Sequence, residues 1–149
     1  MKAVIQRASD ASVTVDNEII ASINFGLVVF VGINYTDSED DVYKLSNKIL
    51  ELRIFNDSMN KTNFNIQQVK GEILLVSQFT LCAETKKGNR PSFVNAMEPN
   101  EAKKLFNKLF DALIISGVKV FKGKFRSMMD VKLNNIGPMT IILDTNNAK

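Results

Sequence analysis

The chain has 149 residues, of which 45% are hydrophobic, and it carries a formal net charge of +3 with a pI of about 9.0. This length suits one domain with one core, and the mild basicity is compatible with a polyanionic partner, although a solvated lysine-rich surface gives the same balance. The sequence contains no histidine and one cysteine, Cys82. Catalysis by Ser-His-Asp or Cys-His groups, histidine-bound metals, two-cysteine zinc sites and internal disulfides are therefore excluded.

The chain shows no segment typical of secretion or membrane insertion. Its longest apolar run, residues 27–31, is far too short to cross a bilayer. The short apolar run at the N-terminus lacks the length and cleavage site of a signal peptide. We therefore expect one cytoplasmic domain over residues 1–149 with no membrane association, and a flexible tail over about residues 146–149.

Four stretches near the N-terminus predict strands. Residues 2–8 alternate between apolar and polar side chains. Residues 12–15 and 18–23 flank Asp16 and Asn17, which tolerate left-handed backbone angles and so predict a tight hairpin. Residues 27–32 are apolar and rich in β-branched side chains, which is typical of a strand buried on both faces.

A helix, a short strand and a second buried strand are predicted next. Asp37 or Ser38 can cap a helix whose apolar side chains recur at helical spacing as far as Leu52. Residues 52–55 predict a short strand, the following polar stretch predicts turns, and residues 72–79 predict a buried strand.

The C-terminal half predicts a basic loop over residues 85–92 and a long helix over residues 100–116. Gly117 stands where a helix C-cap belongs. Three further strands are expected, over residues 118–121, 129–133 and 139–143.

Two amphipathic helices and about eight strands predict an α/β or α+β domain. The sheet is expected to be mixed, with one face buried under the two helices. Several strands are apolar throughout, so the other face also needs cover. Closure into a barrel-like core or burial against a second subunit would provide it.

The first segment that could carry chemistry is Ser77-Gln78-Phe79-Thr80-Leu81, at the end of a buried strand. Strand ends of this kind commonly bind ligands. The Gln78 amide can donate and accept hydrogen bonds, Thr80 offers a hydroxyl, and backbone amides leaving the sheet could bind a carbonyl oxygen. On the residues alone, an ordinary strand end is the more economical interpretation.

The second segment is Asn134-Asn135-Ile136-Gly137-Pro138-Met139-Thr140. A hairpin turn is its simplest interpretation, because Gly-Pro is common in turns. Alternatively, a stiff Gly-Pro pair, with a peptide bond that can be cis, could present two carbonyls in a fixed direction.

The third segment is the basic loop, in which Lys86, Lys87 and Arg90 accompany Gly88 and Pro91. These cations could hold phosphates. A solvated loop is the alternative.

Together these segments resemble the D-aminoacyl-tRNA deacylase family. The first two segments are similar to the two signatures of that family, and four further segments match it in register between residue 1 and about Thr145. Those four are residues 3–7, 52–55, 87–93 and 123–125.

The resemblance implies a homodimer with each active site at the subunit interface and no cofactor or metal. Ser77, Gln78, Phe79 and Thr80 would form the pocket floor and bind the aminoacyl carbonyl, with Phe79 and Thr80 giving backbone amides. Gly137 and Pro138, joined by a cis bond, would come from the other subunit, engage the amino group and exclude an L side chain. The supporting or substrate-binding residues would be Arg7, which would help to hold that motif, Met129, which would line the adenosine pocket, and Asn135.

The implied partner is the acceptor end of an aminoacyl-tRNA, contacted by Lys86, Lys87 and Arg90, and no DNA is expected. A filter made of main-chain atoms works by exclusion, so glycyl-tRNA is a plausible second substrate. Thr80 could be the nucleophile, but it has no adjacent base. The alternative, which we favour, is that the substrate's 2′-hydroxyl helps to activate water.

Two segments depart from the family pattern. Arg126-Ser127-Met128 stands where a small Gly-Ala pair and a polar residue are usual, and Ile136 replaces a common acidic residue. Two rival functions remain: a non-catalytic nucleic-acid-binding protein on the same fold, and a related deacylase class that removes L-alanine and lacks the Phe found here at position 79.

Overall fold

A computed structural model describes residues 1–86 and 88–147 of the chain. Lys87 and part of the predicted tail, residues 148–149, lie outside the described residues. The elements follow in the order β1 (Lys2–Val15), β2 (Glu18–Gly32), α1 (Glu39–Glu51), β3 (Phe55–Asn56), β4 (Thr62–Phe64), β5 (Glu72–Ser77), the 3-10 helix η1 (Phe79–Cys82), α2 (Pro99–Ile115), β6 (Lys119–Lys122), β7 (Asp130–Asp144) and the 3-10 helix η2 (Thr145–Asn147).

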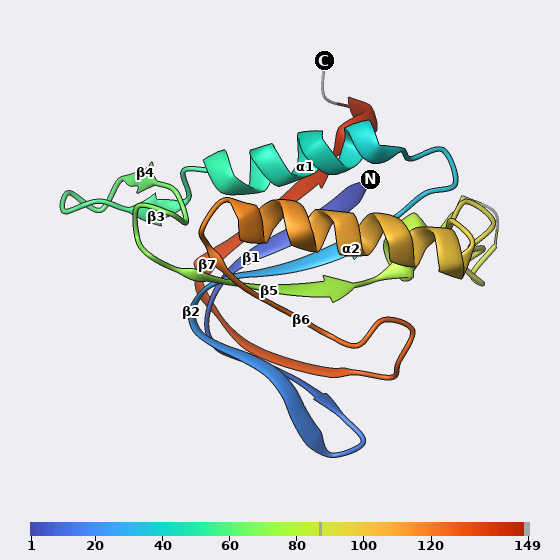
Figure 1. Cartoon of the computed structure of the whole chain (residues 1–149), viewed down its shortest axis with the longest axis horizontal. Helices are drawn as coiled ribbons and strands as arrows, with labels where there is room; N and C mark the ends of the chain where they lie inside the picture. The colour runs from blue at the N-terminus through green and yellow to red at the C-terminus, as the bar shows by residue number, and fades with distance from the viewer. Residues whose placement is uncertain (87, 148–149) are drawn as a thin grey trace.

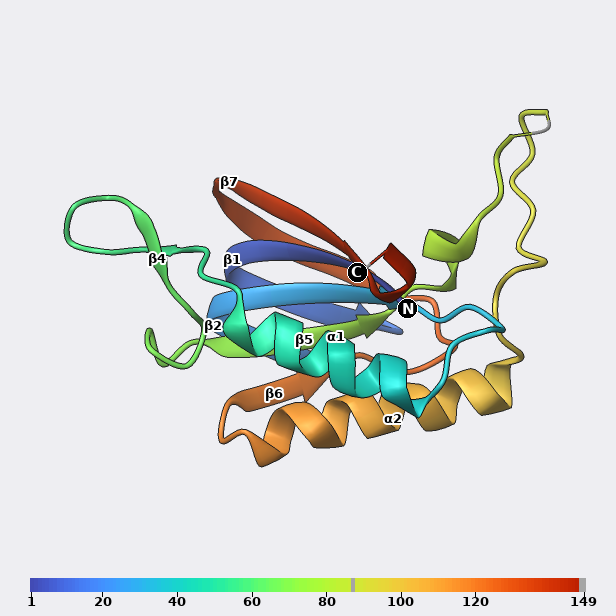
Figure 2. The same ribbon diagram turned by 90° about the horizontal axis from the view of Figure 1, so that it is seen from above.

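Five strands form one mixed sheet in the order β6-β5-β2-β1-β7. β1 is antiparallel to both β2 and β7, whereas β2 pairs with β5 and β5 with β6 in parallel. Both long helices lie side by side over one face of this sheet (Figure 1, Figure 2). The predicted mixed α+β architecture with two covering helices is therefore confirmed.

The main core lies between the helices and the sheet. Leu45 of α1 and Leu109 of α2 pack into the same cluster as Ile5, Val29 and Leu75 of the three central strands. All five side chains are at most 1% exposed. The 3.6-residue spacing of the helices and the two-residue alternation of the strands deliver these side chains to one layer.

A second, smaller cluster fills the opposite face of the sheet. Val28 and Leu74 alternate with the residues of the main core and pack with Val13 and Val15 of β1 and Ile23 of β2. The hairpin of β1 and β2 bends away from the helices, and β7 follows it (Figure 1). The curvature is barrel-like, while β6 and β7 remain the two ends of the hydrogen-bonded order.

Several predicted strands turn out to be parts of longer ones. Residues 2–8 and 12–15 both belong to β1, which continues through Asp10 at a φ of 49° and a shift in pairing register. The last two predicted strands likewise merge into β7, so the hairpin at Gly137-Pro138 is wrong. Irregular residues are absorbed as β-bulges within a paired strand, which local signals for turns do not reveal.

The short strand predicted over residues 52–55 is also largely wrong. Leu52 is the C-cap of α1 and its amide donates to the Lys48 carbonyl at 3.1 Å. Only Phe55 and Asn56 form β3. The apolar side chains of this stretch enter the main core from a loop. The apolar pattern in the sequence therefore reflected burial and not strand structure.

The predicted hairpin at Asp16-Asn17 and the predicted helix ends at Ser38 and Gly117 are confirmed. Asp16 and Asn17 have φ values of 50° and 66°, as a tight hairpin requires. The carboxylate of Glu98 accepts from the amides of Asn100 and Glu101 at 2.9 and 3.3 Å and so caps α2, and Gly117 follows the helix with a φ of 86°. In the part of the chain described, no helix is long and apolar enough to span a membrane.

Candidate active site

A pocket of about 800 Å³ opens at the carboxyl end of β5. Its walls come from four segments: residues 76–80 at the end of β5, residues 93–102 before and within α2, residues 125–131 between β6 and β7, and Val31 and Ile33 at the end of β2. The first of these segments contains the predicted pocket floor, Ser77, Gln78, Phe79 and Thr80. All four residues line the pocket.

The backbone turns sharply where β5 ends. The Gln78 amide donates to the Val31 carbonyl of β2 at 2.7 Å, and the Gln78 carbonyl accepts from the Leu81 amide at 3.2 Å. The turn packs directly on Gly32, where a Cβ would lie 2.8 Å from the Leu81 Cβ. Gly32 therefore permits the 3-10 helix η1 to sit against the sheet and to point its first residues into the pocket.

The first two amides of η1 are suited to binding a carbonyl oxygen. The first amides of a helix have no acceptor within it, and no hydrogen bond found among the described residues uses the amides of Phe79 or Thr80. The Gln78 side-chain amide donates to the Thr80 hydroxyl oxygen. This hydrogen bond orients the hydroxyl, but it does not place a base where it could remove the hydroxyl proton.

An aromatic pair forms one wall of the pocket. Phe79 is 59% exposed and meets Phe93 edge to face at 5.0 Å between ring centroids. Edge-to-face packing fixes both rings. The pocket therefore offers a rigid apolar surface beside the free amides.

Cys82 closes η1 but is no candidate nucleophile. It is 2% exposed, and burial raises the pKa of its thiol, with a further contribution from the Asp37 carboxylate. The thiolate is the reactive form. Cys82 does not line the pocket.

Met129 reaches the pocket from the loop between β6 and β7. The amide of Gly123 ties this loop to the Leu75 carbonyl at 2.9 Å. A Cβ at Gly123 would lie 2.7 Å from the Met129 sulfur, so the glycine leaves the space that Met129 occupies. Phe125 anchors the same loop against Phe106 of α2, with 5.8 Å between the ring centroids.

The second signature lies in β7, outside the pocket. Gly137 and Pro138 are exposed, the bond between them is cis, and Gly137 has a φ of 120°. The Asn135 side chain spans the bulge, accepting from the Met139 amide at 3.2 Å and donating to the Thr140 hydroxyl at 2.9 Å. The bulge is thus held closed by its own strand.

Arg7 supports the same bulge from β1. Its guanidinium is 8% exposed and donates to the carbonyls of Ile136 and Ile54 at 3.2 and 2.8 Å and to the Asn56 side-chain oxygen at 3.0 Å. A Cβ at Gly137 would lie 2.7 Å from Arg7 Nη2. Glycine is therefore the residue that lets the buried guanidinium approach.

Within one chain the two signatures are well separated. Arg7 pairs with Leu27 and Leu27 with Ile73, so Ser77 lies four residues further along the strands. Gly137, opposite Arg7 on β7, is also three strands away from β5. At about 3.3 Å per residue and about 4.8 Å per strand, the separation is roughly 19 Å.

The basic loop projects from the body of the protein between η1 and α2 (Figure 2). Glu84 and Ser92 pair at its base through two backbone hydrogen bonds of 2.8 and 3.0 Å. Lys86 and Arg90 are exposed and do not line the pocket. Lys87 lies outside the described residues.

A family model described as D-Tyr-tRNA(Tyr) deacylase matches residues 4–144 of the chain. The chain belongs to the D-aminoacyl-tRNA deacylase family. The members of this family are hydrolases that act on ester bonds, so the resemblance seen in the sequence is confirmed, as is the class of enzyme.

Two curated relatives show how complete the similarity is. The D-aminoacyl-tRNA deacylase of Aquifex aeolicus is 52% identical over 145 residues, covering 97% of this chain and 98% of the relative. That of Bacillus velezensis is 48% identical over 145 residues, covering 97% of this chain and 99% of the relative.

Two solved structures share the fold. The c-Myc DNA Unwinding Element Binding Protein has a TM-score of 0.92 and 38% identity, with 97% of this chain and 99% of that chain covered. A probable eukaryotic D-amino acid tRNA deacylase has a TM-score of 0.85 at 14% identity, with 95% and 97% covered, which shows the fold alone.

Sequence reasoning missed part of this deacylase-family pocket. Phe93, Glu98 and Arg126 line it, yet none was among the predicted site residues. Glu98 precedes a helix and caps it, and Phe93 follows a basic loop. Neither position carries a local signal of a binding site. Arg126 was noticed only as a departure from the family pattern.

Proposed function

We propose that the protein hydrolyses the ester between a tRNA and a D-amino acid, releasing both. The observation that carries this proposal is the pocket at the end of β5, where free backbone amides, an oriented hydroxyl and an apolar wall meet. Together they suit an acyl ester whose carbonyl becomes negatively charged during hydrolysis. The names of the curated relatives support the substrate class.

The amides of Phe79 and Thr80 bind the acyl oxygen and stabilise its charge in the transition state. The Thr80 hydroxyl already accepts from Gln78, so it serves better as a positioning group than as a nucleophile. With no histidine in the chain, the vicinal 2′-hydroxyl of the terminal adenosine helps to activate water, and Met129 packs against that nucleoside. No cofactor takes part.

The active form is a homodimer in which each pocket receives Gly137 and Pro138 from its neighbour. Within one chain this pair is roughly 19 Å from Ser77 by strand geometry, so it cannot reach its own pocket. Both residues are exposed on the edge strand β7, where Ile142 is also 75% exposed. An exposed edge with apolar side chains suits pairing with a second copy.

Selection between mirror images rests on main-chain atoms. D and L substrates carry the same groups, so discrimination requires a wall that excludes one arrangement. The neighbour's Gly137 and Pro138, held by Arg7 and Asn135, form that wall and bind the amino group. Glycine has no side chain to exclude, so glycyl-tRNA is also hydrolysed.

The acceptor stem lies along the basic loop. Lys86, Lys87 and Arg90 contact its phosphates without reading sequence. Such a substrate places the enzyme in the cytoplasm, where tRNA is charged and used.

Incubation with matched D-, L- and glycyl-tRNA tests the proposal by release of free amino acid. The expected result is rapid hydrolysis of D- and glycyl-tRNA with L-aminoacyl-tRNA spared. Binding of D-aminoacyl-tRNA without turnover would reject the proposal in favour of a nucleic-acid-binding role, the property named for the c-Myc DNA Unwinding Element Binding Protein of the same fold. Selective hydrolysis of L-alanyl-tRNA would assign the chain to the related L-alanine class.

A further inference from the structure

Arg126 occupies an unusual place at the pocket mouth. The pocket lining contains two charged residues, Arg126 and Glu98. The Glu98 carboxylate is engaged with amides at the start of α2, at 2.9 Å from the nearest, and forms no ion pair with Arg126 among the described residues. Arg126 is therefore a cation of the pocket that has no counter-charge from the described chain.

The backbone at Arg126 is held in a conformation that suits glycine. The Ser127 amide donates to the Lys124 carbonyl at 3.3 Å, which makes Arg126 the third residue of a tight turn, and its φ is 61°. A positive φ at the third position normally selects glycine or asparagine. Residues held in this way concentrate at functional sites, because the surrounding structure must enforce them.

The surroundings do enforce this turn. Phe125 packs on Phe106 on one side of Arg126, and Met129 fits against Gly123 on the other. The guanidinium is exposed and makes no hydrogen bond to the described residues. The fold thus presents an unpaired cation on the same loop as Met129, and both residues line the pocket in which the terminal nucleoside is proposed to bind.

We propose that Arg126 binds a phosphodiester of the terminal nucleotides of the acceptor end, and so fixes the ester in the pocket. This inference rests on the proposed function. A guanidinium matches a phosphate with two parallel hydrogen bonds, and the contact forms equally in the ground state and the transition state. Arg126 is a positioning residue, so its loss raises KM while leaving kcat within about twofold of its original value.

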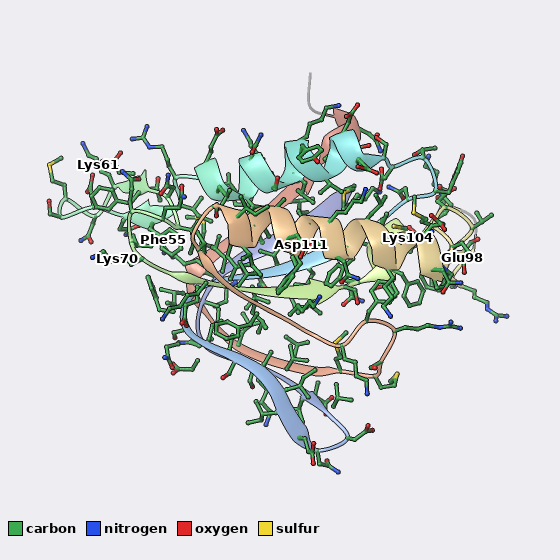
Figure 3. The ribbon with its side chains drawn as sticks, in the orientation of Figure 1. Phe55, Lys61, Lys70, Glu98, Lys104 and Asp111 are labelled. Carbon is green, nitrogen blue, oxygen red and sulfur yellow. The ribbon has the colours of Figure 1, made fainter. Side chains whose placement is uncertain are left out.

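The test compares Arg126→Gly and Arg126→Lys with a matched control, Lys70→Gly. Lys70 is also an exposed cation with a positive φ, 52°. It lies at the opposite end of the molecule from Glu98 (Figure 3). The control therefore repeats the loss of one charge and the relief of one strained residue away from the pocket.

Two substrates separate the phosphate from the rest of the ligand: a D-aminoacyl-CCA trinucleotide and D-aminoacyl-adenosine, which has no phosphodiester. For the trinucleotide, Arg126→Gly should raise KM about tenfold and Arg126→Lys less, and Lys70→Gly should behave as wild type. The slope of log(kcat/KM) against log(salt concentration) should be shallower by about 0.7 for Arg126→Gly, because one phosphate contact is lost. For D-aminoacyl-adenosine all four proteins should be equal.

Equal KM values for wild type and Arg126→Gly on the trinucleotide would overturn the inference, while turnover by wild type would leave the proposed function standing. A defect confined to D-aspartyl and D-glutamyl substrates would also overturn it, since Arg126 would then bind an acidic side chain. Failure of wild type to hydrolyse either substrate would instead reject the proposed function.

Discussion

Replacing Arg7 with methionine should weaken both the stability and the chiral selectivity of the enzyme. The guanidinium of Arg7 is 8% exposed and serves three acceptors, the carbonyls of Ile54 and Ile136 and the Asn56 side chain. Methionine fills a similar volume but donates no hydrogen bond. The buried Ile54 carbonyl is then left without its partner, and Ile136 is released next to Gly137.

The size of the effect follows from these bonds. Leaving a buried acceptor unsatisfied costs about 1–3 kcal/mol, and the two part-buried bonds are replaced largely by water, so we expect a loss of about 2–3 kcal/mol. An unfolding entropy of about 2.1 cal/mol/K per residue gives about 310 cal/mol/K for a chain of this length. Tm should therefore fall by about 6–10 °C.

The assay combines thermal unfolding with the ratio of kcat/KM for D- and L-aminoacyl-tRNA. Arg53→Met is the matched control, because Arg53 is exposed and bonds to Asn63 in the same region. Arg7→Met should lower both Tm and the D:L ratio, whereas the control should change each only slightly. A lower Tm with an unchanged D:L ratio would refute the idea that Arg7 holds the selecting motif.

Three further changes probe other parts of the account. Gly137→Ala places a methyl group 2.7 Å from Arg7 Nη2 at a φ of 120°, so the D:L ratio should drop at least about tenfold; an unchanged ratio would argue against steric exclusion by this bulge. Thr80→Ala should retain substantial activity, while a substrate lacking the 2′-hydroxyl should react poorly, and the reverse would indicate a Thr80 nucleophile. Hydrogen bonds, first from the Lys61 amide, lower the pKa of Asp57 below 3.8, so this carboxylate stabilises the fold above that pH and the benefit is lost as pH falls through the lowered pKa. Asp57→Asn should therefore lower Tm at pH 7 with a difference that shrinks in acid below pH 3.8; a constant difference would contradict the assignment.

The sequence predicted the secondary-structure elements that are determined by the type and spacing of neighbouring residues. Asp16-Asn17 marked the hairpin because these residue types accept the required backbone angles. The stripe of apolar side chains marked α2 to within one residue at each end. The continuous apolar run over residues 27–31 indicated a strand buried on both faces, and the assignment of Val29 to the main core and Val28 to the second cluster confirms it.

Features set by partners distant in sequence were not predicted. β7 continues through Gly137-Pro138 because β1 pairs with it on both sides of the bulge. The Gly-Pro pair by itself indicates a turn, and the neighbouring residues in the sequence do not reveal the pairing with β1. Likewise, nothing local shows that the two signatures lie far apart in one chain. In the sequence, Arg126 is only a departure from the family pattern. The structure shows that it lies in a tight turn and lines the pocket.

The Gly137-Pro138 motif is proposed to act on the pocket of a neighbouring chain. Ala96→Trp fills the pocket, which Ala96 lines, and should abolish hydrolysis, while Gly137→Ala keeps the pocket but loses selectivity. The decisive measurement is the D:L ratio after the two variants are unfolded and refolded together. In mixed dimers the open pocket faces an intact Gly137-Pro138, so we predict that D-selective hydrolysis returns. A D:L ratio unchanged from that of Gly137→Ala alone would contradict the claim.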